Sequence, residues 1–143
     1  MAVGAEHEHD AEDCPCGSGR AFSGCCKPFL DGQANAPTAE ALMRSRYSAY
    51  VLNQADYLQK TWHPDHRPAA LDLDARQNWL GLKVLNSEQG QEYDSQGVVE
   101  FVARFKIDGR GHRLHEISRF EKLDGCWLYV DGTRGSTDYS LRS

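Results

Sequence analysis

The sequence has no long hydrophobic run, and it has no excess of basic charge. No apolar stretch approaches the roughly 20 residues that a membrane-spanning helix needs. The first ten residues lack both the basic start and the apolar run of a secretory signal peptide, so we expect a cytoplasmic protein. There are 16 Lys and Arg against 21 Asp and Glu. This balance indicates neither a nucleic-acid partner nor a membrane partner.

The chain also lacks the local motifs that identify common enzyme classes. It contains no nucleophile motif, phosphate-binding loop or metal-hydrolase signature, and it has no internal repeat. Its 143 residues are enough for one hydrophobic core. These absences favour a small protein without catalytic activity. Any case for catalysis therefore rests on the chemistry of individual side chains.

Cysteine is scarce, but four of the five cysteines are clustered: Cys14, Cys16, Cys25 and Cys26. The surrounding segment has too few aliphatic residues to make its own core, so we expect a bound ion to organise it. Two closely spaced pairs around a Gly-rich turn can supply four ligands to a tetrahedral zinc ion. Because four protein ligands leave no open position, the sequence predicts a structural zinc site.

Two other readings of the cluster are a disulfide knot and free thiols with Cys25 and Cys26 as a redox pair. Clustered cysteines in a reducing compartment are more often metal ligands or redox groups than disulfides. The fifth cysteine, Cys126, alternates with Leu128 and Val130. This pattern predicts a buried, inert thiol on a strand.

Hydrophobic periodicity predicts a helix after residue 37. Thr38 suits its N-cap, and Glu40 lies in the first turn, where the helix dipole favours an anion. An apolar stripe follows at helical spacing, formed by Met43, Tyr47, Tyr50 and Val51.

Two shorter helices are expected next. One begins at Asp56 and ends before Pro64. The other runs from a cap at Asp72 or Asp74 to Gly81. Beyond residue 81 the pattern alternates and predicts strands over 82–88, 98–107, 113–123 and 126–131. Helices followed by an antiparallel meander belong to the α+β class.

Turn residues set the expected register of the sheet. Asp124-Gly125 fits a two-residue hairpin turn, which places Ser118 opposite Asp131. A four-residue loop over 108–111 places Phe101 opposite Ser118.

One face of this sheet is expected to pack on the helices. Buried polar groups cost free energy unless they are bonded, so Glu116, Ser118 and Asp131 on this face are candidate functional residues. The face collects Phe101, Ala103, Phe105, Leu114, Glu116, Ser118, Phe120, Trp127, Tyr129 and Asp131.

The cysteine segment resembles a known zinc motif. Residues 14–26 read Cys-Pro-Cys-Gly-Ser-Gly-Arg-Ala-Phe-Ser-Gly-Cys-Cys and are similar to the SEC-C motif of the SecA translocation ATPase. SecA-type copies often end in Cys-His. The pair Cys25-Cys26 changes the charge of the site but not its number of ligands.

The rest of the chain resembles the uncharacterised bacterial YchJ family. The likeness lies in residues 36–50, in Thr61-Trp-His-Pro64, in Leu114-His-Glu116 and in 127–132. In that family a SEC-C segment precedes a domain similar to nuclear transport factor 2 (NTF2), whose curved sheet wraps around helices as a cone. The resulting division is a disordered leader 1–13, a SEC-C motif 14–31, an NTF2-like domain 36–132 and a polar tail 133–143.

The resemblance also implies a pocket inside the cone. Such folds often hold a small molecule, and members similar to ketosteroid isomerase use a pocket carboxylate as a general base. Glu116 and Asp131 are the candidates for this role. The other pocket candidates are Ser118, Tyr129, Trp127, Phe101, Trp62 and His63.

We expect a structural role for these residues ahead of a catalytic one. Arg44 or Arg46 on the first helix can reach Glu116 and form a buried ion pair that fixes the helix against the sheet. His63, before Pro64, is expected to end a helix rather than to act as a base.

We therefore expect a zinc-binding protein that serves as a non-catalytic protein-interaction or ligand-binding module. The alternative is a small-molecule enzyme or carrier that uses Glu116 or Asp131. A protein partner is expected at the zinc segment and a small-molecule ligand in the cone. Related folds also imply a homodimer through the outer sheet face.

Overall fold

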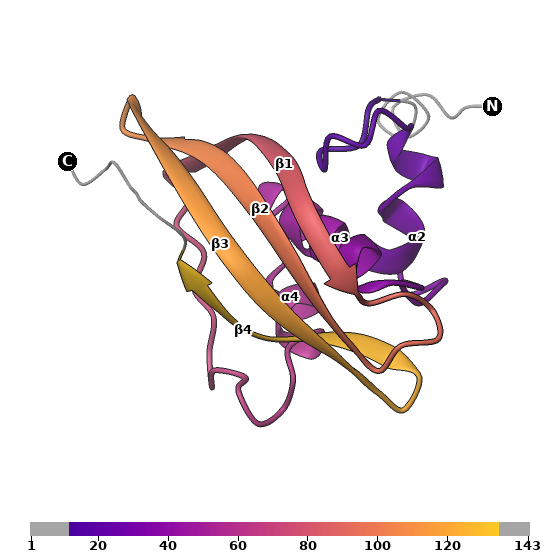
Figure 1. Ribbon diagram of the computed structural model, residues 1–143. Helices are drawn as coiled ribbons and strands as arrows, with labels where there is room; N and C mark the ends of the chain where they lie inside the picture. The colour runs from indigo at the N-terminus through magenta and orange to yellow at the C-terminus, as the bar shows by residue number, and fades with distance from the viewer. Residues whose placement is uncertain (1–11, 135–143) are drawn as a thin grey trace.

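The order of elements follows the predicted change from helices to strands. The computed structural model describes residues 12–134. In it, helices α3 (Ala39–Val51) and α4 (Ala55–Lys60) precede a four-stranded antiparallel sheet. Both helices lie behind the sheet in Figure 1, on the same face. This arrangement confirms the α+β class.

The sheet is a meander whose strands pair in chain order. Two register shifts in the first strand, at Trp79/Gly81 and at Val84/Asn86, bend it as β-bulges do. The long strands twist across α3 (Figure 1). The strands are β1 (Gln77–Gln89), β2 (Gln96–Ile107), β3 (Arg110–Leu123) and β4 (Cys126–Arg134).

Helix α3 begins where its capping residue predicts. The Oγ1 of Thr38 accepts a hydrogen bond from the backbone N–H of Ala41 at 3.0 Å, which satisfies one of the free N–H groups of the first turn. Met43 and Tyr47 of the predicted stripe are buried. The predicted second helix is also present as α4.

The predicted third helix is wrong. Residues 72–76 carry no helix, and β1 starts at Gln77. The Asp74 carboxylate, expected to cap a helix, instead accepts hydrogen bonds from the Arg76 side chain. Neighbouring Trp79 and Leu80 point to opposite faces, with Leu80 55% exposed. Pairing with β2 therefore overrides the local helical pattern.

The last two of the three hairpins close with two-residue turns. Asp124 and Gly125 have φ of 54° and 82°, as a type I′ turn requires, and this turn confirms the prediction. Asp108 and Gly109 form the same turn, with φ of 52° and 83°. The predicted four-residue loop is therefore wrong, and Phe101 pairs with residue 116 instead of residue 118. A shift of two residues leaves the inner face unchanged.

A bulge in the last hairpin overturns a second register prediction. The irregularity lies between Arg119 and Phe120, so Ser118 pairs with Gly132 and not with Asp131. Because successive side chains alternate between the two faces of a strand, one extra residue moves Asp131 to the outer face.

The cysteine segment is part of the main core. It contains a 3-10 turn, η1 (Phe22–Gly24), and a short helix, α2 (Lys27–Leu30), which lies beside α3 (Figure 1). The buried cysteines share one hydrophobic cluster with Leu42 and Tyr47 of α3. The segment and the sheet therefore cover α3 from two sides.

The described chain differs slightly from the predicted boundaries. Residues 1–11 of the expected leader and 135–143 of the expected tail lie outside the described residues. Asp13 forms a β-bridge with Ala21, and β4 continues to Arg134. No helix between residues 12 and 134 is long and apolar enough to cross a membrane.

The cap of α3 gives a test of the fold. Replacing Thr38 by Ala removes the acceptor for the Ala41 N–H and should lower the free energy of unfolding by about 1 kcal/mol. Urea unfolding followed by circular dichroism measures this change. Thr38→Ser keeps the hydroxyl and serves as the control. Equal losses in the two variants would contradict the assignment of the cap.

Candidate metal centre and inner cavity

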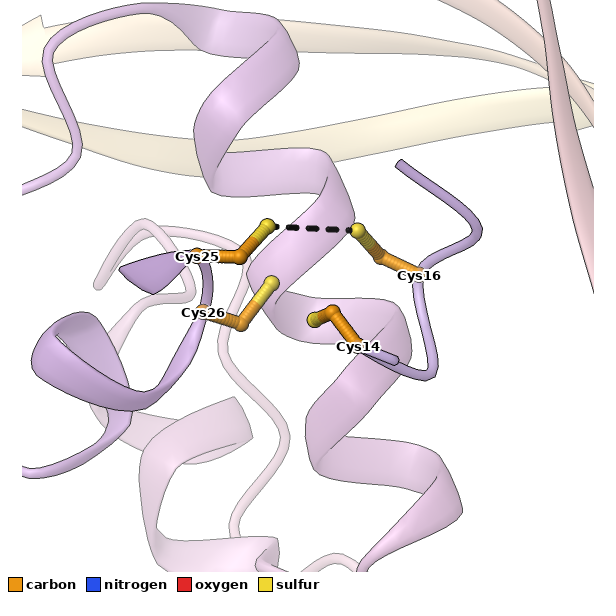
Figure 2. Close-up of side chains that lie close together, drawn as sticks. All are labelled: Cys14, Cys16, Cys25 and Cys26. Carbon is orange, nitrogen blue, oxygen red and sulfur yellow. Dashed lines mark hydrogen bonds between the residues drawn. The ribbon is translucent and has the colours of Figure 1, made fainter. Parts of the chain in front are cut away.

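Four thiols meet at one point beside α3. The sulfur atoms of Cys14, Cys16, Cys25 and Cys26 all lie within 4.8 Å of one another, and they converge from two loops (Figure 2). The Sγ atoms of Cys16 and Cys25 are 3.7 Å apart. A tetrahedron with metal–sulfur bonds of about 2.3 Å has edges of about 3.8 Å. The spacing therefore fits a single tetrahedral metal ion.

Backbone contacts set the two loops. The N–H of Cys14 donates to the carbonyl of Arg20 at 2.9 Å and closes the first loop. Gly17 takes φ of 80° at its tip, a conformation that favours glycine. Cys26 precedes α2, and its carbonyl accepts from the N–H of Phe29 and of Leu30 at 3.0 Å. The second pair of thiols is thus fixed by the start of a helix.

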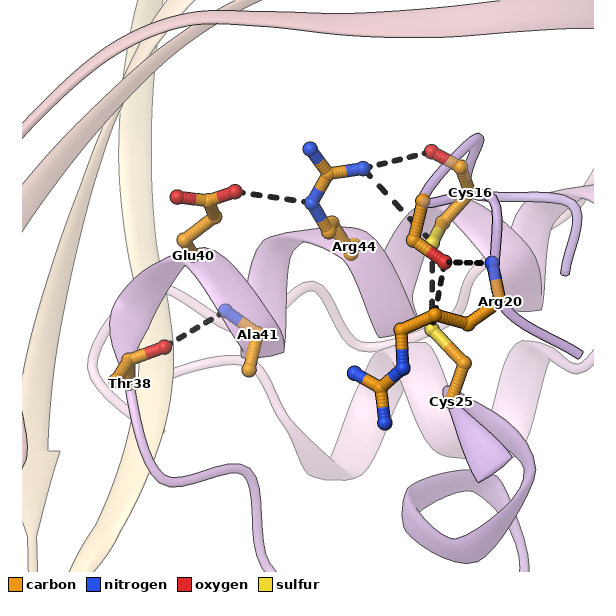
Figure 3. A network of polar contacts seen from close by, with 8 residues as sticks. Cys16, Arg20, Cys25, Thr38, Glu40, Ala41 and Arg44 are labelled. Atoms are coloured by element: carbon orange, nitrogen blue, oxygen red, sulfur yellow. Dashed lines mark hydrogen bonds and ion pairs between the residues drawn. The ribbon is translucent and has the colours of Figure 1, made fainter. Parts of the chain in front are cut away.

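Side chains around the cluster support the sulfur atoms. Arg44 on α3 donates to the carbonyl of Cys16 at 2.9 Å and approaches its Sγ at 3.9 Å (Figure 3). The Oγ of Ser18 lies 3.2 Å from the Sγ of Cys25, and the Oγ of Ser48 lies 3.6 Å from the Sγ of Cys14. Four thiolates around a divalent ion leave net negative charge, which the Arg44 guanidinium offsets.

The thiols influence one another electrostatically. Hydrogen bonds with Cys14 and Cys26 lower the pKa of Cys16. Contact with Cys14 raises the pKa of Cys26, and burial raises that of Cys25. A cation at the centre would favour the ionised form of all four thiols.

None of the five cysteines, all of which lie in the described chain, is bridged to another. The 3.7 Å between Cys16 and Cys25 is far from a disulfide bond length. The structure therefore holds the cluster as free thiols and not as a disulfide knot. Cys126 lies on β4 as predicted, but it is half-buried rather than buried.

A cavity of about 340 Å³ lies between α3 and the inner face of the sheet. Aromatic residues are the largest group in its walls. Tyr47 and Tyr50 of α3 contact the ring of Trp79 on β1, with centroids 5.5 and 5.6 Å apart. Six of the predicted pocket residues line this cavity: Arg46, Trp62, Phe101, Glu116, Ser118 and Tyr129.

Glu116 supplies the carboxylate of the cavity. Its Oε2 accepts hydrogen bonds from the Ser118 hydroxyl at 2.7 Å and from the Tyr129 hydroxyl at 3.0 Å. Burial and the adjacent Glu116 charge raise the pKa of Tyr129, so this hydroxyl keeps its proton and remains a donor. A β-carbon on Gly132 would lie 2.0 Å from the same Oε2. Glycine at this position therefore makes room for the carboxylate.

Arg46 is buried and bonded to the neighbouring helix. Its Nη1 donates to the carbonyl of Leu58 at 2.9 Å and to the hydroxyl of Thr61 at 2.7 Å. Its guanidinium carbon lies 5.1 Å from the ring centre of Trp62 and 4.6 Å from that of Tyr129. Burial lowers the pKa of Arg46. These contacts hold α4 and the sheet against α3.

The predicted ion pair with Glu116 is not formed. Within the described residues, no salt bridge joins Glu116 to Arg44 or to Arg46. Arg44 is on the opposite side of α3, where it contacts Glu40 and Cys16. Glu116 is instead held by hydroxyl groups.

Three other pocket candidates lie outside the cavity. Asp131 forms a bidentate pair with Arg119 at 2.7 Å on the outer face, and these hydrogen bonds lower its pKa. His63 faces Glu121, with Nε2 and Oε1 3.5 Å apart.

Trp127, the third of these, is buried in the core. Its indole N–H donates to the carbonyl of Pro37 at 3.1 Å. This bond fixes the segment that leads into α3.

Sequence reasoning missed several cavity residues. The sequence pattern predicts a helix at Gln77 and Trp79 and a polar tail at Arg134, yet all three residues line the cavity. Of these three residues, only Trp79 could have been found from the sequence, because the alternating pattern from Gln77 onward fits a strand as well as a helix.

The fold and the cysteine cluster together define the class of protein. A curved antiparallel sheet over helices with an inner cavity is an NTF2-like architecture, and the cysteines form a SEC-C motif with a candidate metal centre. The family described as "YchJ, middle NTF2-like domain" matches residues 38–132. The chain belongs to the YchJ family, as its residues predicted.

Curated relatives support the same family. The chain is 54% identical over 123 residues to a UPF0225 protein of Chromobacterium violaceum, covering 83% of this chain and 90% of that protein. It is 51% identical over 119 residues to a UPF0225 protein of Streptomyces coelicolor, with 83% and 93% covered.

Two solved structures resemble the chain over most of its length. A SEC-C motif containing protein from Rhodopseudomonas palustris has a TM-score of 0.77 at 38% identity, with 87% of this chain and all of that chain covered. A sec-c motif containing protein from Psychrobacter arcticus has a TM-score of 0.72 at 29% identity, with 92% and 87% covered.

Gly132 gives a test of the cavity geometry. Replacing it by Ala forces the Glu116 carboxylate to move and breaks its bonds to two hydroxyls. The free energy of unfolding should fall by about 1 to 3 kcal/mol. Gly111→Ala is the control, since a β-carbon there meets no atom within 4 Å. Equal stability of the two variants in urea would contradict this packing.

Proposed function

We propose that this protein binds a small organic molecule in its inner cavity. The observation that carries the proposal is a carboxylate, Glu116, fixed by two hydroxyl groups in the wall of a cavity that is rich in aromatic residues. About 340 Å³ lies within the usual range for ligand pockets. A protein that used this space only as core would be more stable if it were filled.

The proposed metal is a structural zinc ion held by the four thiolates. Zinc suits a closed set of four sulfur ligands. When bound, it would supply no chemistry beyond holding residues 14–26 in place. Arg44 and Ser48 contact the cysteine loops, while Met43 and Tyr47 of the same helix line the cavity. The ion thus supports the cavity through α3. Free thiolate ligands also fit the expected cytoplasmic location.

Metal removal tests the proposed zinc site. Elemental analysis should find one zinc per chain in the wild type and in Cys126→Ser, and little in the double variant Cys25→Ser/Cys26→Ser. A thiol reagent should modify only Cys126 until a chelator is added, and the chelator should lower the melting temperature. Reaction of Cys25 and Cys26 without chelator would instead support the redox pair.

Cavity binding is tested with toluene as a general aromatic probe. In a ¹H–¹⁵N NMR spectrum, the indole signals of Trp62 and Trp79 should shift on titration, because both rings line the cavity. The chemical shift of the Trp127 indole should not change, since Trp127 lies outside the walls of this cavity.

A filled cavity is the matching control. Ala103 lines the cavity, and Ala103→Leu should abolish the shifts, whereas Ala70→Leu on an exposed loop should keep them. Equal shifts in both variants, or none in the wild type, would count against a ligand cavity.

Other expectations from the sequence stay predictions. An enzyme or carrier function that uses the Glu116 carboxylate remains the alternative. Asp131 is no longer a candidate, because it pairs with Arg119 on the outer face of the sheet. A protein partner at the cysteine segment and a homodimer through the outer sheet face are open to pull-down and to sedimentation velocity.

A further inference from the structure

Arg46 is a buried cation in the cavity wall. The residue is only 6% exposed, and its side chain lines the cavity. Its Nη1 donates to the Leu58 carbonyl and to the Thr61 hydroxyl, which are both neutral acceptors. No salt bridge in the chain from residue 12 to residue 134 includes Arg46. A guanidinium keeps its proton even where burial lowers its pKa, so the wall holds this positive charge without a carboxylate bound to it.

The Glu116 carboxylate lies opposite a different arginine. Arg134 is its partner in the register of β3 and β4, and both side chains line the cavity. Cross-strand neighbours on one face of a sheet lie close together, and opposite charges there attract. The charged groups of the wall are therefore two guanidinium groups and one carboxylate. Their sum is positive, and Arg46 is the cation that lies deepest.

This charge balance favours an anion. A buried charge without an opposite charge beside it costs free energy, and a bound anion would offset that cost. The guanidinium of Arg46 is out of water already in the free protein, so binding desolvates only the charge of the ligand. A planar guanidinium also matches the two oxygens of a carboxylate. A carboxylate is therefore the group that we expect beside Arg46.

The walls favour an aromatic ring next to that group. Tyr47, Tyr50, Trp79 and Phe101 present flat apolar surfaces, and aromatic groups gain from stacked or edge-on contacts with such rings. The ring of a ligand can thus lie on these surfaces while its charged group faces Arg46.

Resting on the proposed function, we infer that the cavity takes an aromatic carboxylate whose negative charge offsets the buried guanidinium of Arg46. The inference names the charge and the ring of the ligand, which the proposed function leaves open.

Phenylacetate and phenylacetamide test this inference as a matched pair. They have nearly the same shape, and the amide carries a neutral NH₂ group where the acid carries a charged oxygen. Because a hydrogen bond between charged groups is stronger than one to a neutral group, phenylacetate should bind about tenfold more tightly. The indole signals of Trp62 and Trp79 in an NMR titration of the full chain, at constant ionic strength, measure both affinities.

Two variants change the charge of the wall in opposite directions. Glu116→Gln removes the negative charge and keeps an oxygen for the hydroxyl donors, so the preference for phenylacetate should rise severalfold. Arg134→Gln removes one positive charge at the exposed end of β4, so the preference should fall. Glu88→Gln and Arg110→Gln are the matched controls at exposed strand positions outside the cavity wall, and both should keep the preference of the wild type.

The variant Arg46→Met tests the cation itself. It keeps a long side chain without the charge, so the preference for phenylacetate should disappear while phenylacetamide still binds. Arg46 also holds α4 through Leu58 and Thr61, so circular dichroism checks the fold first. If this variant unfolds, the two charge variants still decide the question.

Each outcome separates the inference from the proposed function. Equal binding of phenylacetate and phenylacetamide to the wild type overturns the inference and leaves a ligand cavity in place. Tighter binding of 2-phenylethylammonium than of phenylacetate overturns the sign of the charge. An unchanged preference in both Glu116→Gln and Arg134→Gln overturns the role of the charged wall. A protein that binds none of these compounds and also ignores toluene overturns the cavity function itself.

Discussion

Helix α3 is held from two sides, and both candidate sites depend on its position. On one side, Arg44 and Ser48 contact the cysteine loops. On the other, Met43, Arg46 and Tyr47 line the cavity under the sheet. A helix of 13 residues moves as a unit. Any loss of order in the cysteine segment therefore also displaces the residues of α3 that line the cavity.

Directional bonds set where this helix lies. Three polar residues of α3 are buried, namely Ser45, Arg46 and Ser48. Ser45 bonds to the Tyr57 hydroxyl at 2.7 Å, and Arg46 bonds to the end of α4. Apolar packing alone tolerates sliding, whereas such bonds fix angle and distance. The buried polar groups thus fix α3 against α4.

Local signals predicted most of the fold. The Thr38 cap and the Asp124-Gly125 turn act within a few residues, so a sequence pattern is enough to find them. The prediction of a third helix was wrong because its residues become a strand only by pairing with β2. The prediction for Asp131 was wrong because one extra residue in β4, Val130, lies opposite the step from Arg119 to Phe120 and reverses the face of the residues beyond it.

The sequence by itself determined the four cysteines, the family and the presence of Glu116 on the inner face. Ligand spacing and strand alternation are properties of the local chain. Only the tertiary structure decided that Arg46 braces α4 instead of pairing with Glu116, and that a glycine at 132 admits the carboxylate. These outcomes depend on distances between segments far apart in sequence, which no local pattern specifies.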